Sequence, residues 1–181
     1  MGSKKHIVRF LAILVLLTAV CAAAYRLLFP FGPRPCYLPM VMQALVMYAE
    51  DNDGYFPTGG RNAREALLKL YPDYITYEFL AGLSGDKKLL KKQMLAGVEI
   101  TEDASSWVYW PGFRNDDPAD LAIIWERSPG VNAISGRAPS GSHAVGFVNG
   151  RFAQVSAKKW FEFLKEQELL RRKIREARVP E

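Results

Sequence analysis

The stretch AVGFVNGRFAQV at residues 144–155 predicts a β-hairpin, and it decides that the fold contains an antiparallel sheet. Apolar residues alternate with small or polar ones on both sides of Asn149 and Gly150. Asn-Gly is the favoured pair for a two-residue type I′ turn, because both of its positions need positive φ angles. Such a turn sets Phe147 opposite Phe152 on one face of the hairpin.

Two further strands are predicted before the hairpin. Residues 106–110 and 121–126 are rich in aromatic and branched side chains and are bounded by turn-forming residues. Residues 38–51 and 63–70 instead carry apolar residues at helical spacing, whereas residues 75–98 favour a loop or a short helix. This order predicts an α+β fold in which a small antiparallel sheet covers the first of these helices.

The C-terminal segment predicts an amphipathic helix with Ser156 as its N-cap. Its apolar residues form a stripe, so one side of the helix is expected to pack and the other to face water. The stripe consists of Trp160, Phe163, Leu164, Leu170 and Ile174.

A hydrophobic segment near the N-terminus predicts a membrane anchor. Residues 10–24 are an uninterrupted apolar run, and residues 10–29 reach the length of a spanning helix if the flanking arginines extend toward the interfaces. Basic residues precede the run, so the positive-inside rule places residues 1–9 in the cytoplasm. The alternative is a signal peptide cleaved after the small residues 22–24.

Beyond the anchor, prolines and glycine at residues 30–37 predict a hinge, because each proline disfavours helix in the residue before it. Residues 38–181 then form one extracytoplasmic domain, since about 145 residues leave no room for a second. The predicted location is the bacterial inner membrane, with a single pass and the C-terminal domain in the periplasm.

The net charge of +5 belongs to the anchor region. Residues 1–35 hold five basic residues and no acid, which leaves 19 basic and 19 acidic residues in the rest of the chain. A nucleic-acid-binding surface needs clustered basic residues, so nucleic acid is not expected as a partner. With Cys21 in the apolar run, Cys36 is the single thiol outside it, and no internal disulfide is expected in the domain.

Several segments resemble the pseudopilin-like proteins of type II secretion, of the major-pseudopilin (prepilin-type) kind found in planctomycete-type bacteria. The resemblance covers roughly residues 36–165. It is carried by LVMYAEDNDGYFP at residues 45–57, ALLKLYPDYI at 66–75, WVYWPG at 107–112, and a closing His143 followed by the hairpin. It implies a pilin-like fold and a non-enzymatic structural or interaction subunit related to type II secretion.

The sequence also departs from that family. Residues 9–13 read RFLAI and lack the glycine and the glutamate of the prepilin cleavage motif, so this motif is degenerate. The second cysteine of the family is missing around residues 80–84, and its closing Asp-Gly is replaced by Asn149-Gly150. The resemblance implies partners of the pseudopilin kind or self-association, through the membrane helix or the C-terminal apolar stripe.

Asp116, Asp117 and Asp120 are the candidate metal ligands. Three carboxylates in a short loop are able to converge on a hard cation such as calcium, and the resemblance implies a calcium loop before the last strands. The competing interpretation is a polar turn closed by Pro118. A periplasmic binding module for a metal ion or a glycan is therefore the alternative function, with exposed tryptophans as the glycan surface.

No catalytic residue is assigned, and no cofactor beyond possible calcium. His143 is the one histidine outside the anchor region, and a general base needs a nucleophile beside it and a group to orient it. Ser140 and Ser142 lie too close along the chain to supply a triad, so His143 is expected to brace the hairpin. Four lysines between residues 87 and 92 favour a solvated helix face, with a lipid-headgroup contact as the alternative.

Overall fold

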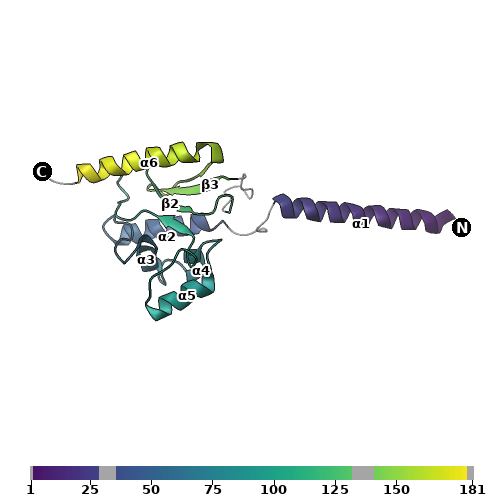
Figure 1. Cartoon of the computed structure of the whole chain (residues 1–181), viewed down its shortest axis with the longest axis horizontal. Coiled ribbons are helices and arrows are strands. Elements are labelled where there is room, and N and C mark those ends of the chain that lie inside the picture. The colour runs from purple at the N-terminus through teal and green to yellow at the C-terminus, as the bar shows by residue number, and fades with distance from the viewer. Residues whose placement is uncertain (1, 29–35, 132–140, 179–181) are drawn as a thin grey trace. The chain divides into compact units, whose positions relative to one another are not determined.

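The computed structural model describes residues 2–28, 36–131 and 141–178, in two compact units that divide between residues 35 and 36. The first unit is helix α1 (Gly2–Leu28), and the second is the folded domain (Figure 1). The predicted hinge at residues 30–37 lies, except for its last two residues, outside the described residues.

The centre of the domain is an antiparallel sheet of four strands in the order β1-β2-β3-β4. Its strands are β1 (Trp107–Tyr109), β2 (Ala122–Glu126), β3 (His143–Phe147) and β4 (Phe152–Val155). Each strand pairs with the next one along the chain, which is the arrangement that short connections favour. The predictions of two strands before a hairpin, and of a mixed helix and sheet class, are confirmed.

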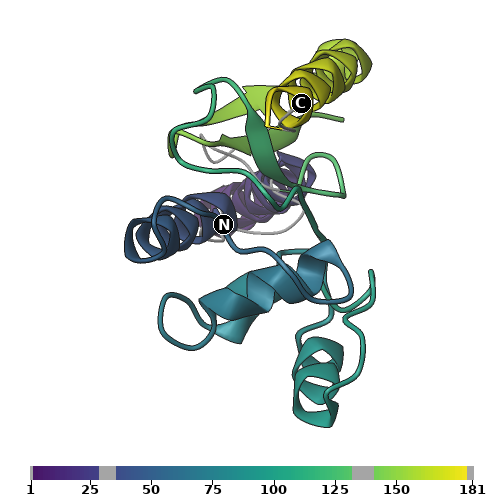
Figure 2. The same ribbon diagram turned by 90° about the vertical axis from the view of Figure 1, so that its left-hand side faces the viewer.

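Helices cover both faces of this sheet. Helix α2 (Tyr37–Asp51) lies against one face and helix α6 (Ala157–Ala177) against the other (Figures 1 and 2). The alternation of side chains along a strand explains how one sheet serves two layers. Trp107 and Tyr109 of β1 point into the core shared with α2, whereas Val108 between them packs in the cluster beneath α6.

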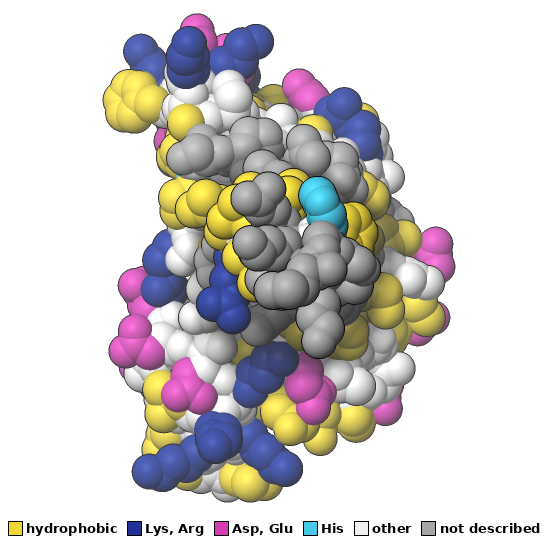
Figure 3. All heavy atoms as spheres, turned by 90° about the vertical axis from the view of Figure 1, so that its right-hand side faces the viewer, with side chains coloured by type: hydrophobic (Ala, Val, Ile, Leu, Met, Phe, Trp, Pro, Cys, Tyr) yellow, Lys and Arg dark blue, Asp and Glu magenta, His cyan; other side chains and the backbone are white. Residues whose placement is uncertain are grey.

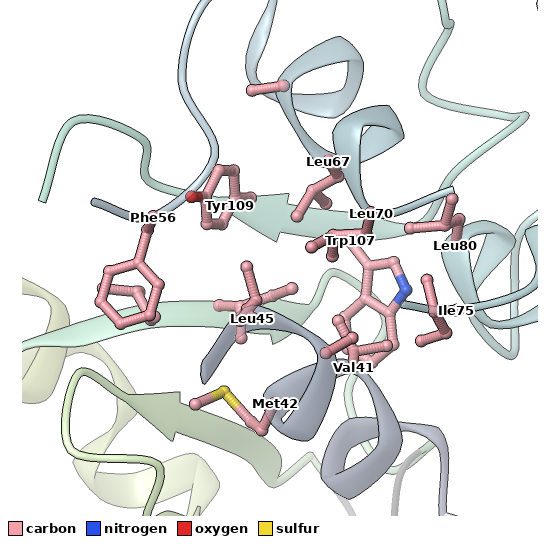
Figure 4. Close-up of a cluster of buried hydrophobic side chains, with 14 of the residues drawn as sticks. Val41, Met42, Leu45, Phe56, Leu67, Leu70, Ile75, Leu80, Trp107 and Tyr109 are labelled. Carbon is pink, nitrogen blue, oxygen red and sulfur yellow. The ribbon is translucent and has the colours of Figure 1, made fainter. Parts of the chain in front are cut away.

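The larger core lies between α2 and the sheet (Figure 4). Val41, Met42 and Leu45 are buried at helical spacing, as the periodicity of residues 38–51 predicted. They meet Trp107 from β1, together with buried residues of the segment between α2 and the sheet. Each such aliphatic side chain contributes roughly 2 kcal/mol by leaving water. The residues from the connecting segment include Phe56, Leu67, Leu70, Ile75 and Leu80.

Short helices fill the connection between α2 and the sheet. They are α3 (Ala63–Leu67), the 3₁₀ turn η1 (Leu68–Leu70), α4 (Tyr77–Ala81) and α5 (Lys87–Ala96). The ambiguous residues 75–98 thus hold two helices. The Asp86 side chain caps α5 by accepting from the backbone N–H groups of Lys88 and Leu89.

The turn of the hairpin differs from the prediction. Gly146, and not Phe147, pairs with Phe152, and Phe147 N–H donates to the carbonyl of Arg151. The loop therefore has three residues, ending in Gly150 with φ +78°, and Asn149 is not among the residues with positive φ. A type I turn followed by a glycine bulge explains this geometry. The physical reason is tertiary: Val148 is buried, and its N–H donates to Leu121.

Helix α6 begins directly after Ser156, as predicted, although the Ser156 side chain makes no capping hydrogen bond in the described structure. Its apolar stripe packs on the sheet, where Trp160, Phe163 and Leu164 join the cluster of Trp125, Val145 and Phe147. Farther along, Gln167 donates to the carbonyl of Asp120 and accepts from Ala122 N–H. Trp160, Phe163, Leu164 and Leu170 stay partly exposed in this packing, and the expected use of the stripe for lateral assembly stays a prediction.

Candidate functional site

The first functional element is the anchor itself. In α1 the 18-residue stretch Phe10–Leu27 is long and apolar enough to cross a membrane, and its side chains are all exposed to the surroundings of the helix. A helix satisfies its backbone hydrogen bonds internally, which is the requirement for crossing hydrocarbon. One membrane-spanning candidate is thus present in the described part of the chain.

Glu126, at the end of β2, is the most unusual side chain of the domain. It is charged by type, yet only 1% of its surface is exposed. Its Oε1 accepts hydrogen bonds from Leu83 N–H at 3.1 Å, Ser84 N–H at 3.0 Å and Ser84 Oγ at 2.8 Å. Ser106 Oγ on the adjacent strand is a fourth donor. These donors replace the water that a carboxylate loses on burial.

The backbone around α4 is built for this contact. Gly82 ends α4 with φ +78° and ψ −177°, a conformation that is essentially restricted to glycine. A Cβ at this position would collide with Ser106 Oγ and lie 3.1 Å from Glu126 Oε1. The carboxylate therefore joins three segments, namely the loop after α4, strand β1 and strand β2. We call Glu126, Leu83, Ser84 and Ser106 the glutamate cradle.

An open hollow of about 470 Å³ adjoins the glutamate cradle. Glu102 at its rim forms ion pairs with Arg64 at 2.6 Å and Arg127 at 3.4 Å. Both serines of the cradle donate to the same carboxylate oxygen, which two backbone amides already occupy. These four donors fix the position of Oε1 and link the loop after α4 to the sheet. The lining residues are Ser84, Gly85, Asp86, Glu102, Asp103, Ser106, Arg127 and Ser128.

Two of the three candidate calcium ligands, Asp116 and Asp117, have carboxylates that pair with arginines. Asp117 accepts two hydrogen bonds from Arg178 at 2.5 and 2.6 Å and a third from Arg114 N–H at 2.7 Å. Asp116 forms an ion pair with the Arg114 side chain at 3.1 Å, and the carbonyl of Asp120 accepts from α6. The described residues contain no group of three or more potential metal ligands. Asp117 and the carbonyl of Asp120 tie α6 and its C-terminal end to the loop, and the calcium site stays a prediction.

His143, the first residue of β3, is buried and braces the sheet against α6. Its ring stacks on Trp160 with centroids 3.8 Å apart, and its Nδ1 lies 3.1 Å from the carbonyl oxygen of Glu126. Burial lowers the pKa of His143, while the contact with the carbonyl acts in the opposite direction. The expected bracing role fits these contacts.

The lowered pKa of His143 predicts a stability that declines in mild acid. Unfolded His143 takes up a proton near pH 6.5 and folded His143 only at lower pH, so the unfolded state binds more protons in that window. The contribution of His143 to the free energy of unfolding should be fully present above about pH 6.5 and be lost progressively below it. Urea unfolding of the full chain in detergent, followed from pH 7.5 to about 5.5, measures this slope. In His143→Gln the dependence of the free energy of unfolding on pH should be weaker than in the unchanged protein. Equal slopes in the two proteins would contradict the prediction. Any contribution from His6 is the same in both proteins and cancels in the comparison.

The tryptophans do not form an exposed glycan surface. Trp107 and Trp125 are buried, whereas Trp110 and Trp160 are partly exposed. Trp125 contacts both of these partly exposed rings edge-on, with centroids 4.8 and 5.8 Å away. The guanidinium of Arg171 in α6 covers Trp110 at 3.6 Å from its centroid. Trp110, Trp125 and Trp160 thus contribute to the packing between the sheet and α6, and Trp107 to the core with α2.

No family model matches this chain, and neither a curated protein nor a solved structure is found to be similar to it. The resemblance to pseudopilins therefore rests on the motifs quoted from the sequence.

Sequence reasoning missed Glu126. The segment AIIWE was predicted to be a strand, but a glutamate at the end of a strand is expected to be exposed to water. A weak signal was available in the sequence, because the glutamate directly follows the apolar run AIIW at residues 122–125. Its donors come from residues 83, 84 and 106, which no local pattern connects to residue 126.

Proposed function

We propose that this protein is a single-pass membrane protein whose folded domain acts outside the cytoplasm as a non-enzymatic structural or interaction subunit. The observation that carries the proposal is the division of the chain into an exposed apolar helix and a separate domain with its own core. Such a division is typical of proteins that display a domain at a membrane surface. The basic residues before Phe10 favour a cytoplasmic N-terminus and hence a periplasmic domain.

The finer proposal is a pseudopilin-like subunit of the bacterial inner membrane. The sequence motifs support it, and so does the arrangement of α2 across an antiparallel sheet after a hydrophobic N-terminal helix. Lateral assembly would use the exposed apolar helix α1, or the partly exposed side of the α6 stripe. The binding-module alternative is less well supported, since Asp116 and Asp117 pair with arginines and Trp110, Trp125 and Trp160 pack between the sheet and α6.

The anchoring proposal predicts a full-length, membrane-embedded protein with an accessible domain. Membrane extracts should contain the intact mass of the chain, and a protease added to spheroplasts should digest residues 36–181 while α1 remains with the membrane. A chain lacking residues 1–35 serves as the matched control and should appear in the soluble fraction. A mass that corresponds to cleavage after Ala24, with the protein soluble in the periplasm, would contradict the proposal.

Assembly through α1 is tested by cross-linking in the membrane. In a chain with Cys21→Ala and Cys36→Ser, single cysteines at successive positions from 12 to 24 should form disulfide-linked dimers with a helical period of about 3.6 residues. That period arises because only one face of a helix meets its neighbour. Uniformly weak cross-linking along the helix would show that the chain does not self-associate through α1.

A further inference from the structure

Helix α5 presents a basic and partly apolar surface. Four of its ten residues are lysines and none is acidic, while Leu90 and Gln93 face the interior. On the outer side Leu95 is 81% exposed and Val98, just after the helix, is 47% exposed. Figure 3 shows Lys and Arg side chains gathered beside hydrophobic ones at the lower edge of the domain, where α5 lies. We call Lys88, Lys91, Lys92, Leu95 and Val98 the lysine surface.

The charge of this surface is not neutralised by its neighbours. In the described residues, no salt bridge joins a lysine of α5 to an acid. Among the nearby acids, Glu78 interacts with Lys87, which lies outside the lysine surface, Asp86 caps the helix, Glu99 accepts from Asn62, and Glu102 pairs with two arginines. The lysine surface is therefore complementary to an anionic partner that also accepts apolar side chains.

Helix α5 begins beside the first residue of α2. Lys87, the first residue of α5, donates to the hydroxyl of Tyr37 at 3.2 Å and lies 5.4 Å from the centroid of its ring. Tyr37 is the first residue of α2, and α1 ends at Leu28. The residues between them span at most about 30 Å, whatever their conformation. Helix α5 thus begins next to the point at which the domain is tethered.

We propose that the lysine surface docks on the anionic headgroups of the membrane that α1 anchors, with Leu95 and Val98 entering the interface. This inference rests on the proposed anchoring by α1. Lysines near an anionic surface and apolar side chains at the headgroup level are the two elements of peripheral membrane binding. The tether supplies a high effective concentration, so that a few such contacts suffice to hold the domain against the membrane.

The test places a fluorescent probe on this surface in the full chain. Leu95→Cys, in a background with Cys21→Ala and Cys36→Ser, is labelled with an environment-sensitive dye. The protein is reconstituted in phosphatidylcholine vesicles with or without phosphatidylglycerol, and quenching by a lipid that carries a headgroup-level spin label is measured. The matched control is Phe161→Cys, because Phe161 is 82% exposed on α6, across the sheet from α5.

The label at residue 95 should be quenched in vesicles with phosphatidylglycerol, and the label at 161 should not. Each lysine contributes roughly fivefold to membrane partition, so Lys88→Glu with Lys91→Glu and Lys92→Glu should abolish the quenching, and high salt should weaken it. Equal quenching at both positions, or none at either, would overturn the proposal. If the fluorescence of the label at residue 95 depends on the protein density in the vesicles and not on phosphatidylglycerol, the proposal is overturned, and the lysine surface contacts a second copy of the chain.

Alkaline extraction of the same vesicles separates this inference from the proposed anchoring. If the protein stays in the vesicles and the probe at residue 95 is unaffected by phosphatidylglycerol, the docking proposal alone fails. If the protein is extracted, the anchoring by α1 fails.

Discussion

Replacement of Glu126 with alanine is expected to lower the free energy of unfolding by about 3 kcal/mol. The reason is that four donors lose their common acceptor in the glutamate cradle, two of which are backbone N–H groups that cannot turn away. The cost of a donor without an acceptor rises with its burial, and Ser106 is the buried donor among the four. The loop after α4 would also lose its link to the sheet. Urea unfolding of the full chain in detergent measures the change.

Two variants make this prediction specific. Glu126→Gln keeps one carbonyl oxygen as an acceptor and should cost less than Glu126→Ala. Glu50→Ala removes an exposed carboxylate from α2 and should change stability by less than about 0.5 kcal/mol. If Glu126→Ala were as stable as Glu50→Ala, the cradle would make no contribution to the fold.

Gly146→Val is expected to lower the free energy of unfolding by about 2–3 kcal/mol. Gly146 lies in the middle of β3, and its φ is not in the left-handed region, so valine suits the backbone and has the higher strand propensity. The cost comes from packing alone. A Cβ at this position would collide with Met42 Sδ and lie 2.8 Å from Met42 Cγ and 3.0 Å from Ile124 Cγ2. Helix α2 approaches the sheet closely because this residue has no side chain.

A double-mutant cycle with Met42→Ala identifies the source of that cost. Met42→Ala alone leaves a cavity and should cost about 2–4 kcal/mol. In the double variant the valine would fill part of this cavity. The loss of stability measured for the double variant should therefore be at least about 1 kcal/mol smaller than the sum of the losses measured for the two single variants. Strict additivity would show that the collision with Met42 is not what makes glycine necessary at residue 146.

Some features of this protein were determined by its sequence alone. The apolar run of α1, the helical spacing in α2 and α6, and the alternation in the strands are periodic patterns within single segments. Each pattern decides which side of its element leaves water, whatever the element packs against. For this reason the class of fold and the membrane-spanning candidate were predictable from residues close together in the chain.

The tertiary structure decided the features that depend on distant partners. Asn149-Gly150 is compatible with more than one turn, and the buried Val148, which donates to Leu121, selected the three-residue loop. The sequence offered Asp117 as a candidate metal ligand. In the folded chain its carboxylate accepts hydrogen bonds from Arg178, 61 residues away.

Glu126 is buried, although its type favours water, because two other segments supply its donors. Hydrogen bonds and ion pairs between distant residues leave no periodic trace in the sequence, so only the folded chain shows which polar groups meet.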